Sequence, residues 1–278
     1  MASEIHSTAV VSPGAELGAD VSVGPYSVIG PRVRIGDGTR VGPQVVIGGV
    51  TTIGRDNVFF GQANIGADPQ DLSYEGEETH LEIGDRNSVR EFVTINRGTV
   101  KGGGRTTIGD DCLLMACSHV AHDCAIGNGV MLANNALLAG HVAVEDGAII
   151  NGAAAVHQFV TVGGLSYIGG LTRVFLDVPP FMVLEGHPAR VRKVNVIGLE
   201  RKGFEADDVQ EIRAAFRQIY RSGEPRHRVL KALAAKQPGR HVQRLIDALQ
   251  RSELGSKGRY RESLREEFLR SGQELVGV

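Results

Sequence analysis

The chain has 278 residues, a formal net charge of -2, 37 glycines, no tryptophan and only 5% aromatic residues. Its hydrophobic content of 42% excludes wholesale disorder, and its length suffices for one large domain or two ordinary ones. Three cysteines are too few for a disulfide framework, no apolar run approaches the roughly 18 residues that a membrane helix needs, and residues 1–7 lack a secretory signal. The sequence therefore predicts a cytoplasmic protein without a membrane span.

Charge and glycine are divided unevenly along the chain. Residues 1–188 contain 10 Lys and Arg against 20 Asp and Glu, whereas residues 189–278 contain 20 against 12. Of the 37 glycines, 29 lie before residue 189. We therefore predict two domains, an acidic and glycine-rich one at 1–188 and a basic one at 189–278.

An aliphatic residue, or once a phenylalanine, recurs at every sixth position through most of the first domain, at 26 positions in all. These positions are Ile5, Val11, Leu17, Val23, Ile29, Ile35, Val41, Ile47, Ile53, Phe59, Ile65, Ile83, Val89, Ile95, Ile108, Leu114, Val120, Ile126, Leu132, Leu138, Val144, Ile150, Val156, Val162, Ile168 and Val174. A period of six is typical of a hexapeptide solenoid, in which three hexapeptides make one triangular coil of about 18 residues. We therefore predict an all-β parallel β-helix, left-handed as in known hexapeptide solenoids. We also predict a homotrimer, because the flat faces and open ends of a solenoid need covering.

Two segments interrupt the repeat. Residues 66–82 are acidic and polar and separate two members of the series by three whole periods, whereas residues 98–105 (GTVKGGGR) shift the register by one. We predict that both segments are loops at corners of the solenoid, where long loops on a rigid scaffold often hold binding sites.

The second domain has the residue spacing of helices. Asp208 and Glu211 resemble a capping box, and the apolar residues that follow keep helical spacing until Ser222–Pro225. Two more helices are predicted at Val229–Ala235 and His241–Leu249, and a last one at Arg261–Leu269 within a tail expected to be mobile from about residue 255. We therefore predict a C-terminal α-helical domain.

Histidines gather at one predicted corner of the solenoid. With an 18-residue coil, His122, His141 and His157 fall within three positions of one another on successive coils, and Asp123 shares the column of His141. His119 lies a few residues away. A single corner histidine is more often a surface residue, but alignment in an independently fixed register favours a general-base site, because imidazole titrates near neutral pH.

A metal site is the competing interpretation of this region. Cys117, His119, His122 and Cys124 lie close together in the sequence, but C-x-H-x-x-H-x-C is not a usual zinc spacing. We predict no metal, and we interpret the cysteines as small inward-facing hydrophobic residues.

Several motifs occur in the order in which one known family has them. They are NIGADPQDLSY (64–74), IGDRN (83–87), TINRGTVKGGG (94–104), HVAHDC (119–124), LANNALLAGH (132–141), AVHQF (155–159), DVPPF (177–181) and GLERKGF (198–204). The chain thereby resembles the UDP-N-acetylglucosamine 3-O-acyltransferases of lipid A biosynthesis over roughly residues 1–220, and more weakly to about 255. The resemblance implies that an R-3-hydroxyacyl group passes from acyl carrier protein to the 3-hydroxyl of UDP-N-acetylglucosamine, the first step of that pathway, without a cofactor.

The resemblance also implies a role for individual residues. His122 would be the general base, Asp123 would orient its ring, and the backbone N–H of Gly140 would stabilise the oxyanion. The other implied residues would bind the sugar nucleotide or the acyl donor, with Gly170 lining the acyl groove: Gln70, Asp71, His119, His141, His157, Gln158, Gly170, Asn195, Arg201 and Lys202.

Three positions differ from the family pattern, which has lysine at Ser73, an acidic residue at Ile197 and arginine at Lys202. Two alternatives therefore stay open, an N-acyltransferase acting on a 3-amino sugar nucleotide and a solenoid that binds nucleotide sugar without catalysis.

The basic second domain would attract the acidic acyl carrier protein. Nothing in the sequence resembles a nucleic-acid-binding module, so we expect no nucleic-acid partner.

Overall fold

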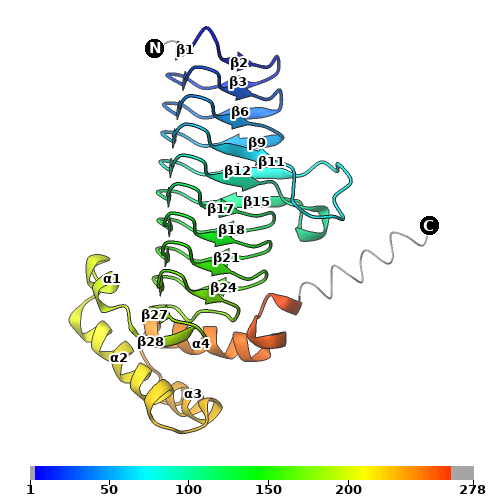
Figure 1. Ribbon diagram of the computed structural model, residues 1–278. Coiled ribbons are helices and arrows are strands. Elements are labelled where there is room, and N and C mark those ends of the chain that lie inside the picture. The colour runs from blue at the N-terminus through cyan, green and yellow to red at the C-terminus, as the bar shows by residue number, and fades with distance from the viewer. Residues whose placement is uncertain (1–3, 264–278) are drawn as a thin grey trace.

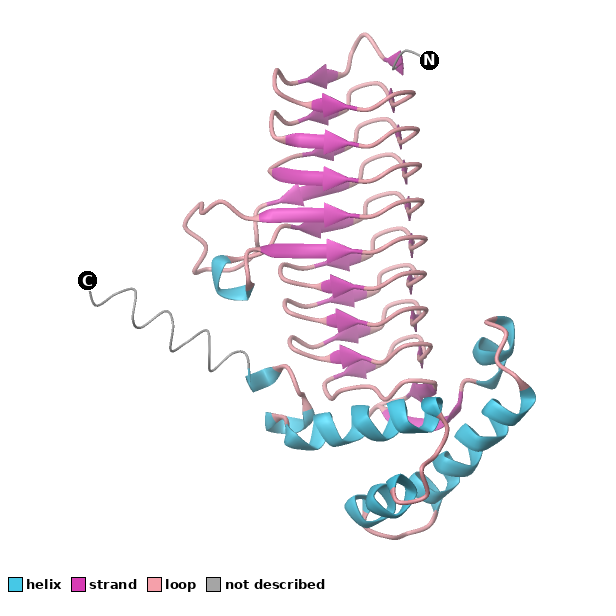
Figure 2. Ribbon diagram, turned by 180° about the vertical axis from the view of Figure 1, so that it is seen from behind, coloured by secondary structure: helices cyan, strands magenta, loops and turns pink. Residues whose placement is uncertain are grey.

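The structure is a computed structural model, and it describes residues 4–263. Short parallel strands stack into a tall triangular prism, and the α-helices gather at the C-terminal end of that prism (Figure 1). Figure 2 shows the same arrangement from behind, with two loops that project from one side of the prism. Among the described residues, no helix is long and apolar enough to cross a membrane.

Three sheets form the three faces of the prism, and we call them sheets A, B and C. In hydrogen-bonded order, sheet A contains β1 (Glu4–Ile5), β4 (Ser22–Val23), β7 (Arg40–Val41), β10 (Val58–Phe59), β13 (Ser88–Val89), β16 (Leu113–Leu114), β19 (Met131–Leu132), β22 (Ile149–Ile150), β25 (Tyr167–Ile168), β27 (Met182–Glu185) and β28 (Arg190–Val194). Sheet B contains β2 (Val10–Val11), β5 (Val28–Ile29), β8 (Val46–Ile47), β11 (Asn64–Ala67), β14 (Thr94–Asn96), β17 (His119–Val120), β20 (Leu137–Leu138), β23 (Ala155–Val156) and β26 (Arg173–Val174). Sheet C contains β3 (Glu16–Leu17), β6 (Val33–Ile35), β9 (Val50–Ile53), β12 (His80–Ile83), β15 (Arg105–Ile108), β18 (Ala125–Ile126), β21 (Ala143–Val144) and β24 (Thr161–Val162).

The chain visits sheets A, B and C in turn, and a coil without an inserted loop takes 18 residues, as in the pairing of Val10 with Val28, except at the C-terminal end, where Tyr167 pairs with Val183. The two predicted loops account for the longer coils. Ile53 pairs with Ile83 across the first loop, and Ile83 pairs with Ile108 across the second. The prediction of two loops on a solenoid of 18-residue coils is confirmed.

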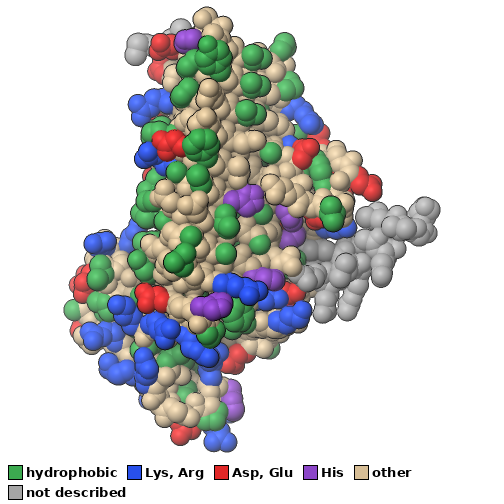
Figure 3. Space-filling model, viewed as in Figure 1, with side chains coloured by type: hydrophobic (Ala, Val, Ile, Leu, Met, Phe, Trp, Pro, Cys, Tyr) green, Lys and Arg blue, Asp and Glu red, His purple; other side chains and the backbone are tan. Residues whose placement is uncertain are grey.

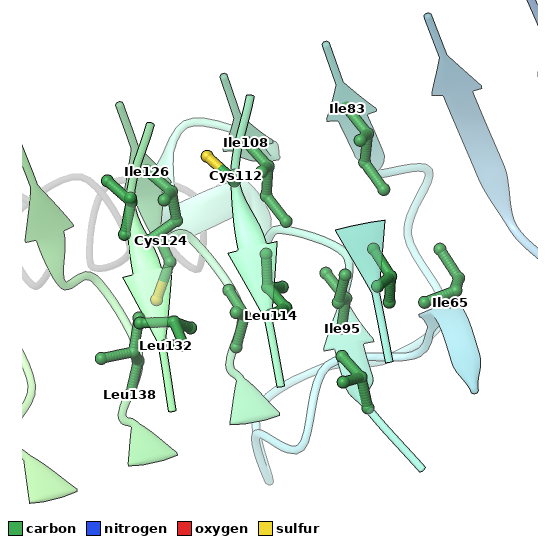
Figure 4. Close-up of a cluster of buried hydrophobic side chains, with 14 of the residues drawn as sticks. Ile65, Ile83, Ile95, Ile108, Cys112, Leu114, Cys124, Ile126, Leu132 and Leu138 are labelled. Carbon is green, nitrogen blue, oxygen red and sulfur yellow. The ribbon is translucent and has the colours of Figure 1, made fainter. Parts of the chain in front are cut away.

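The six-residue series forms the core of the prism. Every member from Val23 to Val174 is at most 4% exposed. Figure 4 shows side chains from neighbouring coils stacked between the sheets. The first coil has no coil above it, which is why Ile5 remains 46% exposed. Stacked aliphatic side chains therefore fill most of the core in this chain with few aromatic residues.

The cysteines divide between core and surface. Cys112 and Cys124 are buried in the prism, as predicted and as Figure 4 shows. The prediction is wrong for Cys117, which is exposed. Cys117 occupies a corner position with a φ of 60°, where the chain turns between sheets and its side chain points outward.

Four α-helices follow the prism: α1 (Val196–Arg201), α2 (Ala206–Arg221), α3 (Arg226–Ala234) and α4 (Arg240–Leu254). The last three confirm the predicted helices. The capping box is wrong, because α2 begins two residues before Asp208 and its N-cap, Glu205, makes no side-chain capping bond. A second hydrophobic core that includes Phe181, Met182 and Leu199 joins these helices to the end of the prism.

The start of the C-terminal tail, which the sequence predicts to be mobile from about residue 255, packs against the prism through Arg259 and Tyr260. The Arg259 guanidinium donates to the Phe175 carbonyl at 2.8 Å, and the Tyr260 N–H donates to Asp177 at 2.7 Å. Arg259 and Glu262 form a buried ion pair of 2.8 Å. Most of the helix predicted at 261–269 lies outside the described residues.

Candidate active site

The two loops and the aligned histidines share one corner of the prism. Residues 68–79 connect β11 to β12 and residues 97–104 connect β14 to β15, so both loops leave sheet B and return to sheet C. The segments that hold His122, His141 and His157 make the same B–C connection. In Figure 3, histidine side chains gather on the face below the projecting loops. A rigid edge with two overhanging loops is a common setting for a binding site.

His122 and Asp123 form a short side-chain interaction at this corner. The distance from Nδ1 of His122 to Oδ2 of Asp123 is 2.7 Å, and the Asp123 side chain is fully buried. A carboxylate can only accept hydrogen bonds, so Nδ1 holds the ring proton and Nε2 has a free lone pair. His122, whose side chain is 13% exposed, is thus arranged to accept a proton at Nε2.

His141 packs against this pair in a neutral state. Its ring meets the His122 ring edge-on, with centroids 5.2 Å apart, and stacks on Phe159 at 4.4 Å. Burial lowers the pKa of His141 to about 4, so the ring is uncharged near neutral pH. A neutral His141 does not repel the positive charge that forms when His122 takes up a proton.

Gly140 lies directly against the His122 ring. A Cβ at this position would be 2.5 Å from Cε1 and 2.8 Å from Nε2 of His122, which leaves no room for a side chain. No hydrogen bond among residues 4–263 uses the Gly140 N–H. The Gly140 peptide therefore offers a free donor beside the proton-accepting nitrogen.

The loop at 68–79 places Asp71 near His122. The Ser73 backbone N–H and hydroxyl both donate to Oδ1 of Asp71 at 2.9 Å. These bonds lower the pKa of the Asp71 carboxyl, with a smaller electrostatic contribution from His122. Gln70 beside it is exposed. Both predicted loop residues are available to a ligand at this corner.

Arg97 fixes the base of the same loop. Its buried guanidinium donates to the Gly66 carbonyl at 2.7 Å, to Asp68 at 2.6 Å and to the Tyr74 hydroxyl at 2.9 Å. The loop is therefore held at its start and in its middle.

The remaining histidines of the corner have partners of their own. Nδ1 of His119 lies 2.7 Å from the Thr94 hydroxyl, and burial lowers the pKa of His119. Nδ1 of His157 lies 3.1 Å from the Gln158 carbonyl oxygen. His157 and Gln158 are one coil below Ala139 and Gly140, as the predicted register requires.

Four predicted site residues lie elsewhere in the same protomer. Gly170 is at the corner between sheets A and B. Asn195 caps α1, where its Oδ1 accepts from the Gly198 N–H at 3.2 Å and its Nδ2 donates to the Leu165 carbonyl at 2.9 Å. Arg201 and Lys202 are exposed near the corner between sheets C and A, where Lys202 lines a shallow cavity. A single chain therefore does not bring all of the predicted site residues together at one corner.

The geometry favours proton transfer over zinc binding. His122, Asp123 and His141 offer ligand atoms within 4.8 Å of one another, but the Asp123 oxygens and His122 Nδ1 are already bonded to each other and to the protein. Cys117 points out of a different corner, and burial raises the pKa of the Cys124 thiol to about 12. The C-x-H-x-x-H-x-C segment thus does not form a ligand cluster.

Sequence reasoning missed three residues of this corner. Thr99 binds Asp123, Phe159 stacks on His141, and Nε of Arg261 donates to the His141 carbonyl at 3.1 Å. The first two lie within quoted motifs, so the signal for them was present. Arg261 lies beyond the repeat, where no register predicts its position.

Comparisons with known proteins point to one family of acyltransferases. A family model described as "Udp N-acetylglucosamine O-acyltransferase; Domain 2" matches residues 177–257, and a bacterial transferase hexapeptide model matches residues 14–49 and 105–140. A Paracidovorax citrulli protein named acyl-[acyl-carrier-protein]--UDP-N-acetylglucosamine O-acyltransferase is 53% identical over 239 residues, 85% of this chain and 91% of the relative. A Synechocystis protein of the same name is 48% identical over 186 residues, 67% of each chain.

Solved structures match over nearly their whole length. The LpxA of Acinetobacter baumannii is 40% identical, with a TM-score of 0.85 over 89% of this chain and 96% of that one. The UDP-N-acetylglucosamine acyltransferase of Bacteroides fragilis is 39% identical, with a TM-score of 0.86 over 88% and 96%. The predicted left-handed parallel β-helix with a helical C-terminal domain is confirmed. This chain belongs to the UDP-N-acetylglucosamine O-acyltransferase family of hexapeptide-repeat proteins.

Proposed function

We propose that this protein transfers an R-3-hydroxyacyl group from acyl carrier protein to the 3-hydroxyl of UDP-N-acetylglucosamine, the first step of lipid A biosynthesis. The observation that supports the proposal most directly is the 2.7 Å bond between His122 and buried Asp123, which leaves Nε2 free at the loop-covered corner. The names of relatives that are about half identical to this chain support the substrates.

The proposed reaction needs one base and one oxyanion donor. Nε2 of His122 takes the proton of the sugar 3-hydroxyl while that oxygen attacks the thioester carbonyl carbon. The Gly140 N–H stabilises the resulting oxyanion, and Asp123 stabilises the imidazolium. Collapse of the intermediate breaks the C–S bond, and the departing thiolate takes the proton from His122. The products are the 3-O-acyl sugar nucleotide and the free carrier thiol.

The loop and corner residues would hold the substrates around this pair. Gln70, Asp71 and His119 are assigned to the sugar nucleotide. His141, His157 and Gln158 line the same corner and are assigned to the junction of sugar and acyl donor.

We further propose that the protein acts as a homotrimer. Val10, Val28 and Val46 are 56%, 39% and 41% exposed, and they stack on successive strands of sheet B. Such an apolar stripe on a flat face is typical of a buried interface. A trimer would let a neighbouring protomer supply Gly170, Asn195, Arg201 and Lys202, which a single chain places on other corners.

The acidic carrier protein would dock on the basic helical end. A cavity of about 550 Å³ between the last strands and the helices is lined by Arg190, Arg192, Arg221 and Arg226. Figure 3 shows Lys and Arg side chains gathered over this end of the molecule. Complementary charge would speed association with the carrier protein.

Three unpaired cysteines fit a reducing compartment, which supports the cytoplasm as the location.

The test is a turnover assay with 3-hydroxyacyl carrier proteins of several chain lengths, offered with UDP-N-acetylglucosamine or its 3-amino analogue and read by mass spectrometry. His122→Ala should lower turnover by about two to four orders of magnitude, the usual effect of losing a general base. His6→Ala, at an exposed histidine on the opposite end of the prism, is the matched control and should not change turnover. Faster acylation of the amine would favour the N-acyltransferase. If no donor thioester is cleaved, the protein is not an acyltransferase, and the alternative of a solenoid that only binds nucleotide sugar is supported.

A further inference from the structure

Asp123 is held on two sides by the loop at 97–104. The Thr99 N–H donates to Oδ1 of Asp123 at 2.7 Å, and the Thr99 hydroxyl donates to Oδ2 at 2.7 Å. Oδ2 is also the atom that accepts from His122. Thr99 is itself 5% exposed, so water does not compete for these bonds.

We propose that Thr99 is a positioning residue of the catalytic pair, which fixes the Asp123 carboxylate in the orientation that aims Oδ2 at Nδ1 of His122. This inference rests on the proposed function, since it assigns to Thr99 an effect on the base that acts in that reaction. Thr99 is buried and bonded to Asp123, so its effect passes through Asp123.

The loop is built to point the Thr99 hydroxyl at Asp123. Thr99 is the N-cap of η1 (Val100–Gly102), and its Oγ1 accepts from the Gly102 N–H at 3.1 Å. Because that bond occupies the acceptor side of the hydroxyl, its proton is directed to Oδ2. A Cβ at Gly102 would overlap the Asp123 carboxylate, so only glycine lets the loop close over it. The Gly104 N–H, which donates to the Thr99 carbonyl at 2.8 Å, closes the same turn.

A variant without the Thr99 hydroxyl should differ from the wild type in how the His122–Asp123 pair binds protons. Two donors from Thr99 stabilise the negative charge of Asp123, which is buried. Without the hydroxyl the carboxylate is less stabilised, so the His122–Asp123 pair takes up an additional proton more readily, on either residue. Activity needs the form with fewer protons, so the acid limb of the pH–rate profile would move to higher pH.

The experiment compares Thr99→Val with Thr99→Ser in the full-length protein. Valine keeps the shape and the backbone N–H but lacks the hydroxyl, whereas serine keeps both donors. For Thr99→Val we expect a kcat about 10- to 100-fold lower, the effect of losing one hydrogen bond to a charged group. We also expect KM values within about two-fold of the wild type and an acid limb at higher pH. Thr99→Ser should restore both kcat and the limb.

Several outcomes would overturn the inference. It is wrong if Thr99→Val keeps the wild-type kcat and pH profile, or if Thr99→Ser is as impaired as Thr99→Val. It is also wrong if Thr99→Val loses activity without a shift of the limb, since that result indicates a loss of folded enzyme only. If Thr99→Val does not fold, Thr99→Ala removes the same donor and should show the same limb shift. His122→Ala separates the two proposals: an active His122→Ala refutes the proposed function, whereas an inactive His122→Ala beside a fully active Thr99→Val refutes only this inference.

Discussion

A single methyl group at Gly140 tests whether the position of His122 controls the reaction. In Gly140→Ala the new Cβ would lie 2.5 Å from Cε1 and 2.8 Å from Nε2 of His122, well inside van der Waals contact. The ring is a side chain, whereas the Gly140 backbone is fixed in the solenoid, so the ring is what moves. A carbon needs roughly 3.5 Å from its neighbours, so the displacement is about 1 Å. A shift of this size typically costs about 100-fold in rate.

The assay is steady-state formation of the 3-O-acyl sugar nucleotide, with the free energy of unfolding measured in parallel. Gly140→Ala should lower kcat about 100-fold and leave the fold intact, because its backbone N–H remains and its side chain is small. Gly48→Ala is the matched control, since Gly48 occupies the same B–C corner and a Cβ there meets no atom within 4 Å. A Gly140→Ala enzyme with kcat within two-fold of the wild type would refute the reasoning.

Two further predictions concern the residues packed around the site. Burial lowers the pKa of His141 to about 4 in the folded protein, against 6.5 for an ordinary histidine. The unfolded chain therefore binds more protons between about pH 4 and 6.5, and folding stability should fall as the pH is lowered through this window. Thermal unfolding of wild type and His141→Gln at pH 7 and pH 5 checks the sign, and an equal loss in both proteins would contradict it. In the tail, Arg259→Ala removes the bond to the Phe175 carbonyl and leaves Glu262 buried without this partner. Hydrogen exchange at Tyr260, whose N–H is bonded to Asp177, should become faster than in the wild type, and unchanged exchange would show that Arg259 does not hold the segment.

The repeat made the fold and the place of the site predictable from the sequence. One aliphatic residue in every six fixes an 18-residue coil, because only that spacing stacks the series into a continuous core. Since His122, His141 and His157 follow the same count, their shared corner could be predicted before any contact was known. The exposed Cys117 was not predictable from its neighbours, because its direction depends on the corner at which the chain turns.

The contacts that aim the base were decided only by the tertiary structure. Thr99 reaches Asp123 from a loop whose length follows no repeat, and a periodic register says nothing about how such a loop folds back. Arg261 reaches the His141 carbonyl from a tail outside the repeat altogether. By itself the sequence determined the prism and the corner at which the aligned histidines lie, because a repeated spacing converts directly into position. The hydrogen bonds that orient those side chains needed the folded chain, because they join segments whose separation no period sets.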